Sequence, residues 1–153
     1  MKPIGSGYLE FDKVSFSWPN GVNVINQCSF SIVKPGLWML VGENGSGKST
    51  LFRLINGVIS PNSGKIFCSL RPSMVYQNPD HQLLMPTCKS ELMLSVPKAT
   101  PISNLFDLIQ SALEKVDLGE MLDRPIHTLS GGQKQRLALA GAIVSNSNLL
   151  LLD

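Results

Sequence analysis

The sequence predicts an α/β fold, and three observations support this prediction. Apolar residues alternate with polar ones over residues 8–33, as is typical of β-strands. A continuous apolar run, Leu37–Val41, then leads through a glycine-rich loop into a predicted helix over residues 48–56. Near the end, a second helix that begins at Ser130 is followed by another apolar strand, Leu149–Leu152. Alternation of such elements is typical of an α/β domain.

The first strands show one irregularity. Leu9 and Phe11 occupy one set of alternating positions, whereas Val14 and Phe16 continue the alternation one position out of step. Residues 19–21, Pro-Asn-Gly, predict a turn before the next strand. We therefore expect a β region with a local disturbance.

The middle of the chain changes to a helical pattern. After short strands over residues 65–68 and 73–76, residues 79–124 read as a mainly helical insertion. Its apolar positions fall at helical spacing: Ile102, Leu105, Phe106, Ile109, Ala112, Leu113 and Val116. Ser130 and Gln133 then form the pattern of a capping box.

Composition excludes several classes of protein. The 153 residues are 43% hydrophobic and carry a net charge of +2, which argues against a dedicated nucleic-acid binder. The three cysteines have no metal-binding spacing, so we expect buried thiols. His81 and His127 share no such spacing either, and we expect them to be structural or exposed. No apolar stretch reaches transmembrane length, so any membrane association is expected through a partner.

Residues 42–50 match the pattern G-x-x-x-x-G-K-[ST], which binds nucleotide phosphates. The glycines let backbone N–H groups surround the phosphates, and the following helix directs its positive end to the same place. We predict that Lys48 contacts the β- and γ-phosphates of ATP and that Ser49 is a ligand of Mg²⁺. The predicted nucleotide-binding residues in this loop are Gly42, Asn44, Gly45, Gly47, Lys48, Ser49 and Thr50. The alternative is a glycine turn with a chance lysine.

Two later features fit the same chemistry. Asp153 follows the apolar strand Leu149–Leu152, where a carboxylate can hold Mg²⁺ beside a phosphate loop. The segment Leu129–Gln133, Leu-Ser-Gly-Gly-Gln, predicts a second helix start with bare amides, and hence a second anion site. Its alternative is an ordinary capped helix. One nucleotide rarely needs two such sites.

The order of these motifs, together with Gln77, resembles that of the ABC ATPases, for which the LSGGQ sequence is very specific. The resemblance covers the chain from residue 8 onward. It implies a P-loop NTPase (RecA-like) core with an antiparallel β subdomain and a helical insertion. It also implies a head-to-tail dimer, homomeric or heteromeric, with ATP between the phosphate loop of one domain and the signature of the other. The signature residues are Ser130, Gly131, Gly132 and Gln133.

The resemblance assigns further roles. Trp18 stands where the family usually has a tyrosine that stacks on adenine, with an ordinary strand aromatic as the alternative. Gln77 resembles the glutamine that contacts Mg²⁺ and relays contact with the transport partner. Lys48, Gln77 and Asp153 are accordingly the expected catalytic residues, and Ser49, Gln77 and Asp153 the expected metal ligands.

Residues 76–87 resemble the ATPases of energy-coupling-factor and cobalt-type importers. This resemblance implies an ATP-hydrolysing subunit that energises membrane-embedded transporter subunits. Such a subunit is peripheral to the membrane, on the cytoplasmic or organelle-stromal side. Two other functions remain open: a soluble ABC ATPase that acts on ribosomes or DNA, and a protein that binds ATP without turnover.

The sequence departs from the family at its end. The family has a catalytic glutamate directly after the position of Asp153, and a histidine further on. We therefore expect an incomplete ABC domain over residues 1–153, with impaired hydrolysis and partly uncovered apolar strands. Its expected parts are a β subdomain and core over residues 1–78 and 131–153, and a helical subdomain over residues 79–130.

Overall fold

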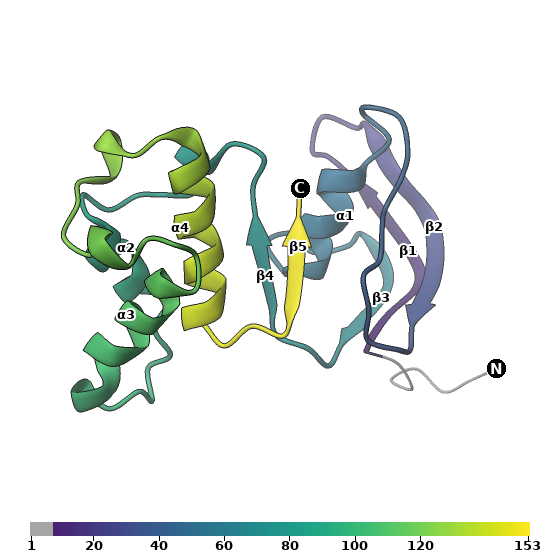
Figure 1. Cartoon of the computed structure of the whole chain (residues 1–153). Helices are drawn as coiled ribbons and strands as arrows, with labels where there is room; N and C mark the ends of the chain where they lie inside the picture. The colour runs from purple at the N-terminus through teal and green to yellow at the C-terminus, as the bar shows by residue number, and fades with distance from the viewer. Residues whose placement is uncertain (1–7) are drawn as a thin grey trace. The chain divides into compact units, whose positions relative to one another are not determined.

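The computed structural model describes residues 8–153, which group into two compact units (Figure 1). The first unit contains residues 8–72 together with Asp153, and the second contains residues 73–152. By contacts, residues 131–152 therefore group with the helices that precede them. The expected helical subdomain over residues 79–130 stays a prediction.

An antiparallel sheet forms most of the first unit. Its strands are β1 (Leu9–Ser17), β2 (Asn23–Ile32) and β3 (Ser63–Cys68), in the order β2-β1-β3. The predicted turn between the first two strands is confirmed, since Trp18 N–H donates to the carbonyl of Val22 at 2.9 Å. The apolar side chains of β1 are buried: Leu9, Phe11, Val14 and Phe16.

The irregular alternation in β1 corresponds to a β-bulge. Phe11 lies opposite Phe30, but Val14 lies opposite Cys28, so β1 contains one extra residue. Lys13 lies at the bulge and has a φ of +48°. The bulge keeps both Phe11 and Val14 on the buried face.

The predicted helix after the glycine-rich loop is confirmed as α1 (Lys48–Ile55). Leu51, Leu54 and Ile55 are its buried apolar residues. Gly57 follows the cap with a φ of +72°, a conformation that glycine adopts without steric strain. The glycine therefore ends the helix, as expected.

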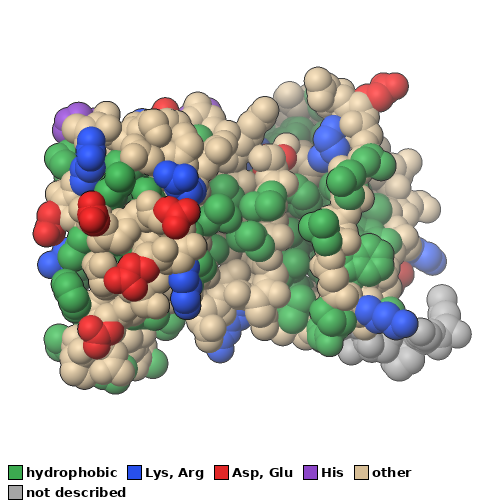
Figure 2. Space-filling view, in the orientation of Figure 1, with side chains coloured by type: hydrophobic (Ala, Val, Ile, Leu, Met, Phe, Trp, Pro, Cys, Tyr) green, Lys and Arg blue, Asp and Glu red, His purple; other side chains and the backbone are tan. Residues whose placement is uncertain are grey.

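The prediction of a buried strand over Leu37–Val41 is wrong for this structure. Neither sheet of the described residues includes this segment. Leu37 is 95% exposed and Met39 is 82% exposed. An apolar run forms a strand only where a neighbour takes up its backbone N–H and C=O groups. Hydrophobic side chains are accordingly visible on the surface of the first unit (Figure 2).

Helices dominate the second unit, as predicted. Its elements before the last strand are η1 (Pro79–His81), α2 (Cys88–Ser95), η2 (Ile102–Asn104), α3 (Leu105–Glu114), η3 (Gly119–Met121), η4 (Ile126–Thr128) and α4 (Gly131–Val144). They enclose a core formed mainly by Cys88, Leu92, Ile109, Leu113, Leu118, Leu137, Ala140 and Val144. Among the expected apolar positions, Ile102 in η2 and Phe106 in the first turn of α3 are exposed instead and lie outside this cluster.

A two-stranded sheet joins the first and last elements of the second unit. It pairs β4 (Pro72–Val75) with β5 (Leu149–Leu152), and the arrows run in the same direction in Figure 1. Both strands were predicted. In β5 only Leu151 is buried, and Leu152 is 58% exposed. The expectation of partly uncovered apolar strands is therefore confirmed for β5.

Candidate functional site

Glycine is required at Gly47 in the phosphate loop for two reasons. This residue precedes α1 with a φ of +95°, which side-chain-bearing residues rarely adopt. A Cβ atom there would also lie 2.8 Å from Cγ1 of Val24. At Gly42 a Cβ atom would lie 2.8 Å from Oγ of Ser46, and Gly45 has a φ of +82°. Each of these glycines thus has a conformational or steric reason to lack a side chain.

The ammonium of Lys48 is held against the start of the loop. Its Nζ donates to the carbonyl of Gly42 at 2.9 Å and to that of Glu43 at 2.6 Å. Lys48 is also the first residue of α1, whose leading N–H groups have no partner within the helix. A full positive charge and the positive end of a helix dipole therefore lie at one place, which suits a phosphate group.

Ser49 and Asp153 are 104 residues apart in sequence and meet in the first unit. The Ser49 hydroxyl donates to Oδ1 of Asp153 at 2.7 Å. Adjacent ligands of an octahedral Mg²⁺ lie about 2.9 Å apart, because Mg–O bonds are about 2.05 Å. The hydroxyl and carboxylate oxygens therefore fit neighbouring positions of a Mg²⁺ ion. Residues 8–153 contain no group of three His, Cys, Asp or Glu that could hold a metal, so phosphate and water would complete such a site.

The second helix start, at α4, has the predicted capping box. Ser130 Oγ accepts from the N–H of Gln133 at 3.3 Å, and Oε1 of Gln133 accepts from the N–H of Ser130 at 2.8 Å. These side chains are therefore occupied within the cap. The N–H groups of Gly131 and Gly132 remain as donors at the helix start, since they have no acceptor within the helix.

Nothing within the described chain requires glycine at Gly131 or Gly132. A Cβ atom at either position would meet no heavy atom within 4 Å, and neither residue has a positive φ. Both residues are exposed. Glycine nevertheless lowers helix stability by up to about 1 kcal/mol relative to alanine. The two glycines therefore leave a bare, open backbone surface that the fold itself does not need.

Trp18 is held by two neighbours in the first unit. Its ring meets Phe16 edge-on at 5.0 Å, and Cζ of Arg53 lies 6.0 Å from the ring centroid. Trp18 is half-buried. Sequence analysis missed Arg53, because only the fold brings α1 beside the turn after β1.

Gln77 is exposed and lies two residues after the end of β4, in the second unit. The structure thus groups Lys48, Ser49, Asp153 and Trp18 in the first unit, and Gln77 and the Ser130–Gln133 helix start in the second. Lys134, also missed from the sequence, forms an ion pair with Asp80 at 2.5 Å in the second unit. No sequence pattern could have predicted this pair.

The cysteines and histidines show no sign of a further site. Burial raises the pKa of the Cys88 thiol above its usual value and keeps the thiol protonated. This agrees with the prediction of a buried thiol for Cys88, whereas Cys28 and Cys68 are only half-buried. His81 and His127 are exposed.

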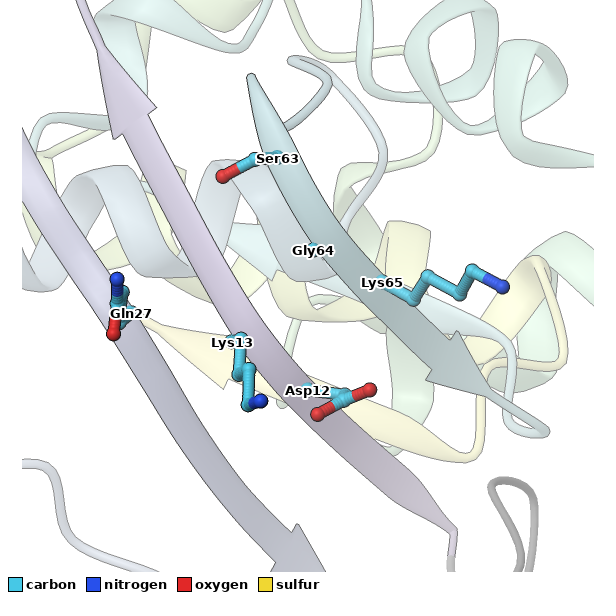
Figure 3. Close-up of a pocket in the computed structure, with 6 residues that line it drawn as sticks. All are labelled: Asp12, Lys13, Gln27, Ser63, Gly64 and Lys65. Carbon is cyan, nitrogen blue, oxygen red and sulfur yellow. The ribbon is translucent and has the colours of Figure 1, made fainter.

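An open hollow lies on the face of the antiparallel sheet, beside the bulge in β1 (Figure 3). Two of its residues, Lys13 and Gln27, have positive φ angles. The lining residues are Asp12, Lys13, Gln27, Ser63, Gly64 and Lys65. None of the predicted site residues belongs to this hollow, so we assign it no part in the site.

Within residues 8–153, no helix has the combination of length and apolar character needed to cross a membrane.

Known proteins resemble this chain along most of its length. The profile of the ABC transporter family matches residues 25–153. ABC transporter I family member 10 of Arabidopsis thaliana is 42% identical over 134 residues, covering 86% of this chain and 49% of that protein. The energy-coupling factor transporter ATP-binding protein EcfA of Malacoplasma penetrans is 35% identical, covering 95% of this chain and 55% of that protein.

A solved structure agrees with the fold. The structure of cbiO1 from Clostridium perfringens, described as part of the ABC transporter complex cbiONQ, superposes with a TM-score of 0.81 at 27% identity. The superposition covers 97% of this chain and 65% of the cbiO1 chain. The chain spans about half the length of the curated relatives it matches. From the profile match and the motif geometry, the chain belongs to the ABC transporter family.

Proposed function

We propose that this chain is part of the ATP-binding and ATP-hydrolysing subunit of a membrane importer of the energy-coupling-factor or cobalt type. The observation that carries the proposal is the contact of Ser49 with Asp153 beside the Lys48 loop. It joins a phosphate-binding helix start to a carboxylate suited to Mg²⁺. The names of the relatives EcfA and cbiO1 support the transporter type.

We assign the nucleotide contacts as follows. Lys48 and the loop amides bind the phosphates, and Trp18 stacks on the adenine. Ser49 and Asp153 would hold Mg²⁺, which neutralises charge on the phosphates when it is bound, and Gln77 is a further metal ligand only by the family resemblance. The remaining loop contacts are assigned to Gly42, Asn44, Gly45, Gly47 and Thr50.

The signature helix start is proposed to serve a second domain. At Gly131 and Gly132, no heavy atom of the described chain lies within 4 Å of an added Cβ atom. An anion from outside the chain can approach such a backbone closely. We infer a head-to-tail dimer, homomeric or heteromeric, in which Ser130–Gln133 contacts the nucleotide of the partner domain.

The proposed partners in transport are membrane-embedded subunits. The subunit would be peripheral to the membrane, on its cytoplasmic or organelle-stromal side. Nucleic acid is not an expected partner, because the net charge is only +2. On the face in Figure 2, acidic and basic side chains are interspersed over the helical unit, which supports this view.

The experiment that tests the proposal uses the full-length protein purified with its membrane partners. Mg²⁺-dependent ATP hydrolysis is expected, and Asp153→Ala should lower it by about 100-fold or more through loss of a metal ligand. Full turnover by Asp153→Ala, or no co-purification with membrane subunits, would contradict the proposal.

A further inference from the structure

The loop that begins at Gln77 is attached at several points within the second unit. Its residues run from the end of β4 through η1 to the cap of α2. Side chains from three places hold this loop. Each attachment lies within residues 73–152, so it can be described without reference to the first unit.

Gln82 fastens the loop back onto the strand that precedes it. Its Oε1 accepts from the N–H of Tyr76 at 3.2 Å, and its Nε2 donates to the carbonyl of Met74 at 3.2 Å. Both contacts are partly buried, which makes them stronger than exposed ones. Gln82 therefore holds the backbone that immediately precedes Gln77.

Asp80 connects the same loop to the signature helix. Asn78 Oδ1 accepts from the N–H of Asp80 at 3.0 Å and caps the short η1 turn. The carboxylate of Asp80 then accepts from Nζ of Lys134 at 2.5 Å. Lys134 lies in the first turn of α4, where its N–H donates to the carbonyl of Ser130.

The two side chains of this ion pair differ in how deeply they are buried. The Lys134 side chain is only 17% exposed, whereas that of Asp80 is 61% exposed. Removing Asp80 would leave a mostly buried ammonium without a carboxylate, which is costlier than losing an exposed pair. Lys134 therefore depends on Asp80 more than Asp80 depends on Lys134.

The far end of the loop is also fixed. Oε2 of Glu91, on α2, accepts from the N–H groups of Leu84 and Met85 at 2.9 and 2.8 Å. The loop is thus held at β4, α4 and α2, and the Asp80–Lys134 ion pair is the side-chain contact that reaches α4.

We propose that Asp80 is a positioning residue that locks the Gln77 loop to the signature helix through Lys134. This inference rests on the proposed function, in which Gln77 serves one nucleotide and Ser130–Gln133 serves the nucleotide of the partner domain. The ion pair then links the two nucleotide-contacting elements of one chain, so that a shift of one is passed to the other.

The test compares Asp80→Asn, Lys134→Met and the double variant in the full-length protein with its partners. Each single variant should lower the kcat of ATP hydrolysis about three- to fivefold, and Asp80→Asn should lower it at least as much as Lys134→Met, because it leaves the mostly buried Lys134 ammonium without a carboxylate. The double variant should fall no further, because both changes break one interaction. The swap Asp80→Lys with Lys134→Asp should restore part of the loss. Asp123→Asn, an exposed carboxylate in the same unit, is the control.

ATP affinity separates positioning from binding. The variants should leave the Kd for ATP within about twofold of the unchanged protein, since Lys48 and Ser49 lie in the first unit. Additive losses in the double variant, or kcat values equal to that of the Asp123→Asn control, would overturn the inference.

Hydrogen exchange tests the lock without relying on turnover. The N–H groups of Asp80, Gln82 and Leu83 should exchange faster in both single variants than in the control. If the unchanged protein hydrolyses no ATP, the proposed function fails, yet exchange still reports on the lock. If hydrolysis is normal and exchange does not respond to either variant, only the lock is refuted.

Discussion

Two helix starts in this chain are proposed to receive phosphate, but they use glycine for different reasons. Before α1, Gly47 has a positive φ, and a side chain there would strike Val24. At α4, Gly131 and Gly132 have ordinary backbone angles and open space around them. The first glycine serves the fold of its own chain. The other two lower helix stability with no gain among residues 8–153, which supports the proposal that they serve an approaching molecule.

The largest expected effect is at the first helix start. Lys48→Ala should weaken ATP binding by about 2–3 kcal/mol, roughly 30- to 150-fold, because a charged hydrogen-bond donor to phosphate is lost. Isothermal titration of the full-length protein measures this. Lys65→Ala, which removes an exposed lysine of β3 in the same unit, is the matched control. Equal affinities for the two variants would remove Lys48 from the site.

Gly47→Ala tests whether glycine there serves the fold. The variant should lose about 1–3 kcal/mol of unfolding free energy in chemical denaturation, from backbone strain and the contact with Val24. Gly57→Ala is the control, because it has a positive φ but no heavy atom within 4 Å of an added Cβ. The Gly57→Ala variant should therefore lose less unfolding free energy, because only backbone strain contributes. A Gly47→Ala protein as stable as the parent would break the comparison.

Substitution of the signature glycines, Gly131 and Gly132, should not lower the unfolding free energy. Gly131→Ala and Gly132→Ala should each leave the unfolding free energy unchanged or raise it by up to about 1 kcal/mol. ATP hydrolysis by the assembled protein should nevertheless fall about tenfold or more, because a methyl group blocks the approach to the helix start. Denaturation and turnover are measured on the same preparation. A loss of stability like that of Gly47→Ala would show that these glycines serve the fold after all.

The smallest expected change concerns the cap of α4. Ser130→Ala removes the acceptor for the N–H of Gln133 and should lower stability by about 1 kcal/mol. Thr87→Ala removes the equivalent acceptor at the capping box of α2. Both variants should lose similar stability by thermal denaturation, but only Ser130→Ala should also slow ATP hydrolysis. If the Ser130→Ala and Thr87→Ala variants hydrolyse ATP equally fast, Ser130 acts only as a helix cap.

Local signals in the sequence predicted local features well. The capping box of Ser130 and Gln133 depends on residues three apart, and the bulge at Lys13 appears as a break in alternation. The helix start at Lys48 follows from the glycines before it. These features need only neighbouring residues, so a linear pattern can indicate them.

Features that depend on residues far apart in the sequence could not be predicted from local patterns. The run Leu37–Val41 has the composition of a strand, but a strand needs a neighbour, and the described chain supplies none. Arg53 beside Trp18 and Lys134 beside Asp80 join residues more than thirty positions apart. Motif order placed Ser49 and Asp153 at one metal, yet only the fold shows their hydroxyl and carboxylate in contact.

The contact of Ser49 with Asp153 has a consequence for the newly made protein. A ribosome must synthesise 104 further residues after Ser49 before the carboxylate exists, and closing so long a flexible loop costs about 4 kcal/mol. Pairing of β4 with β5 shortens that loop, because it brings the first and last elements of residues 73–152 together. Folding of residues 73–152 should therefore favour the Ser49–Asp153 contact, and mutations that slow this folding should delay the contact during translation.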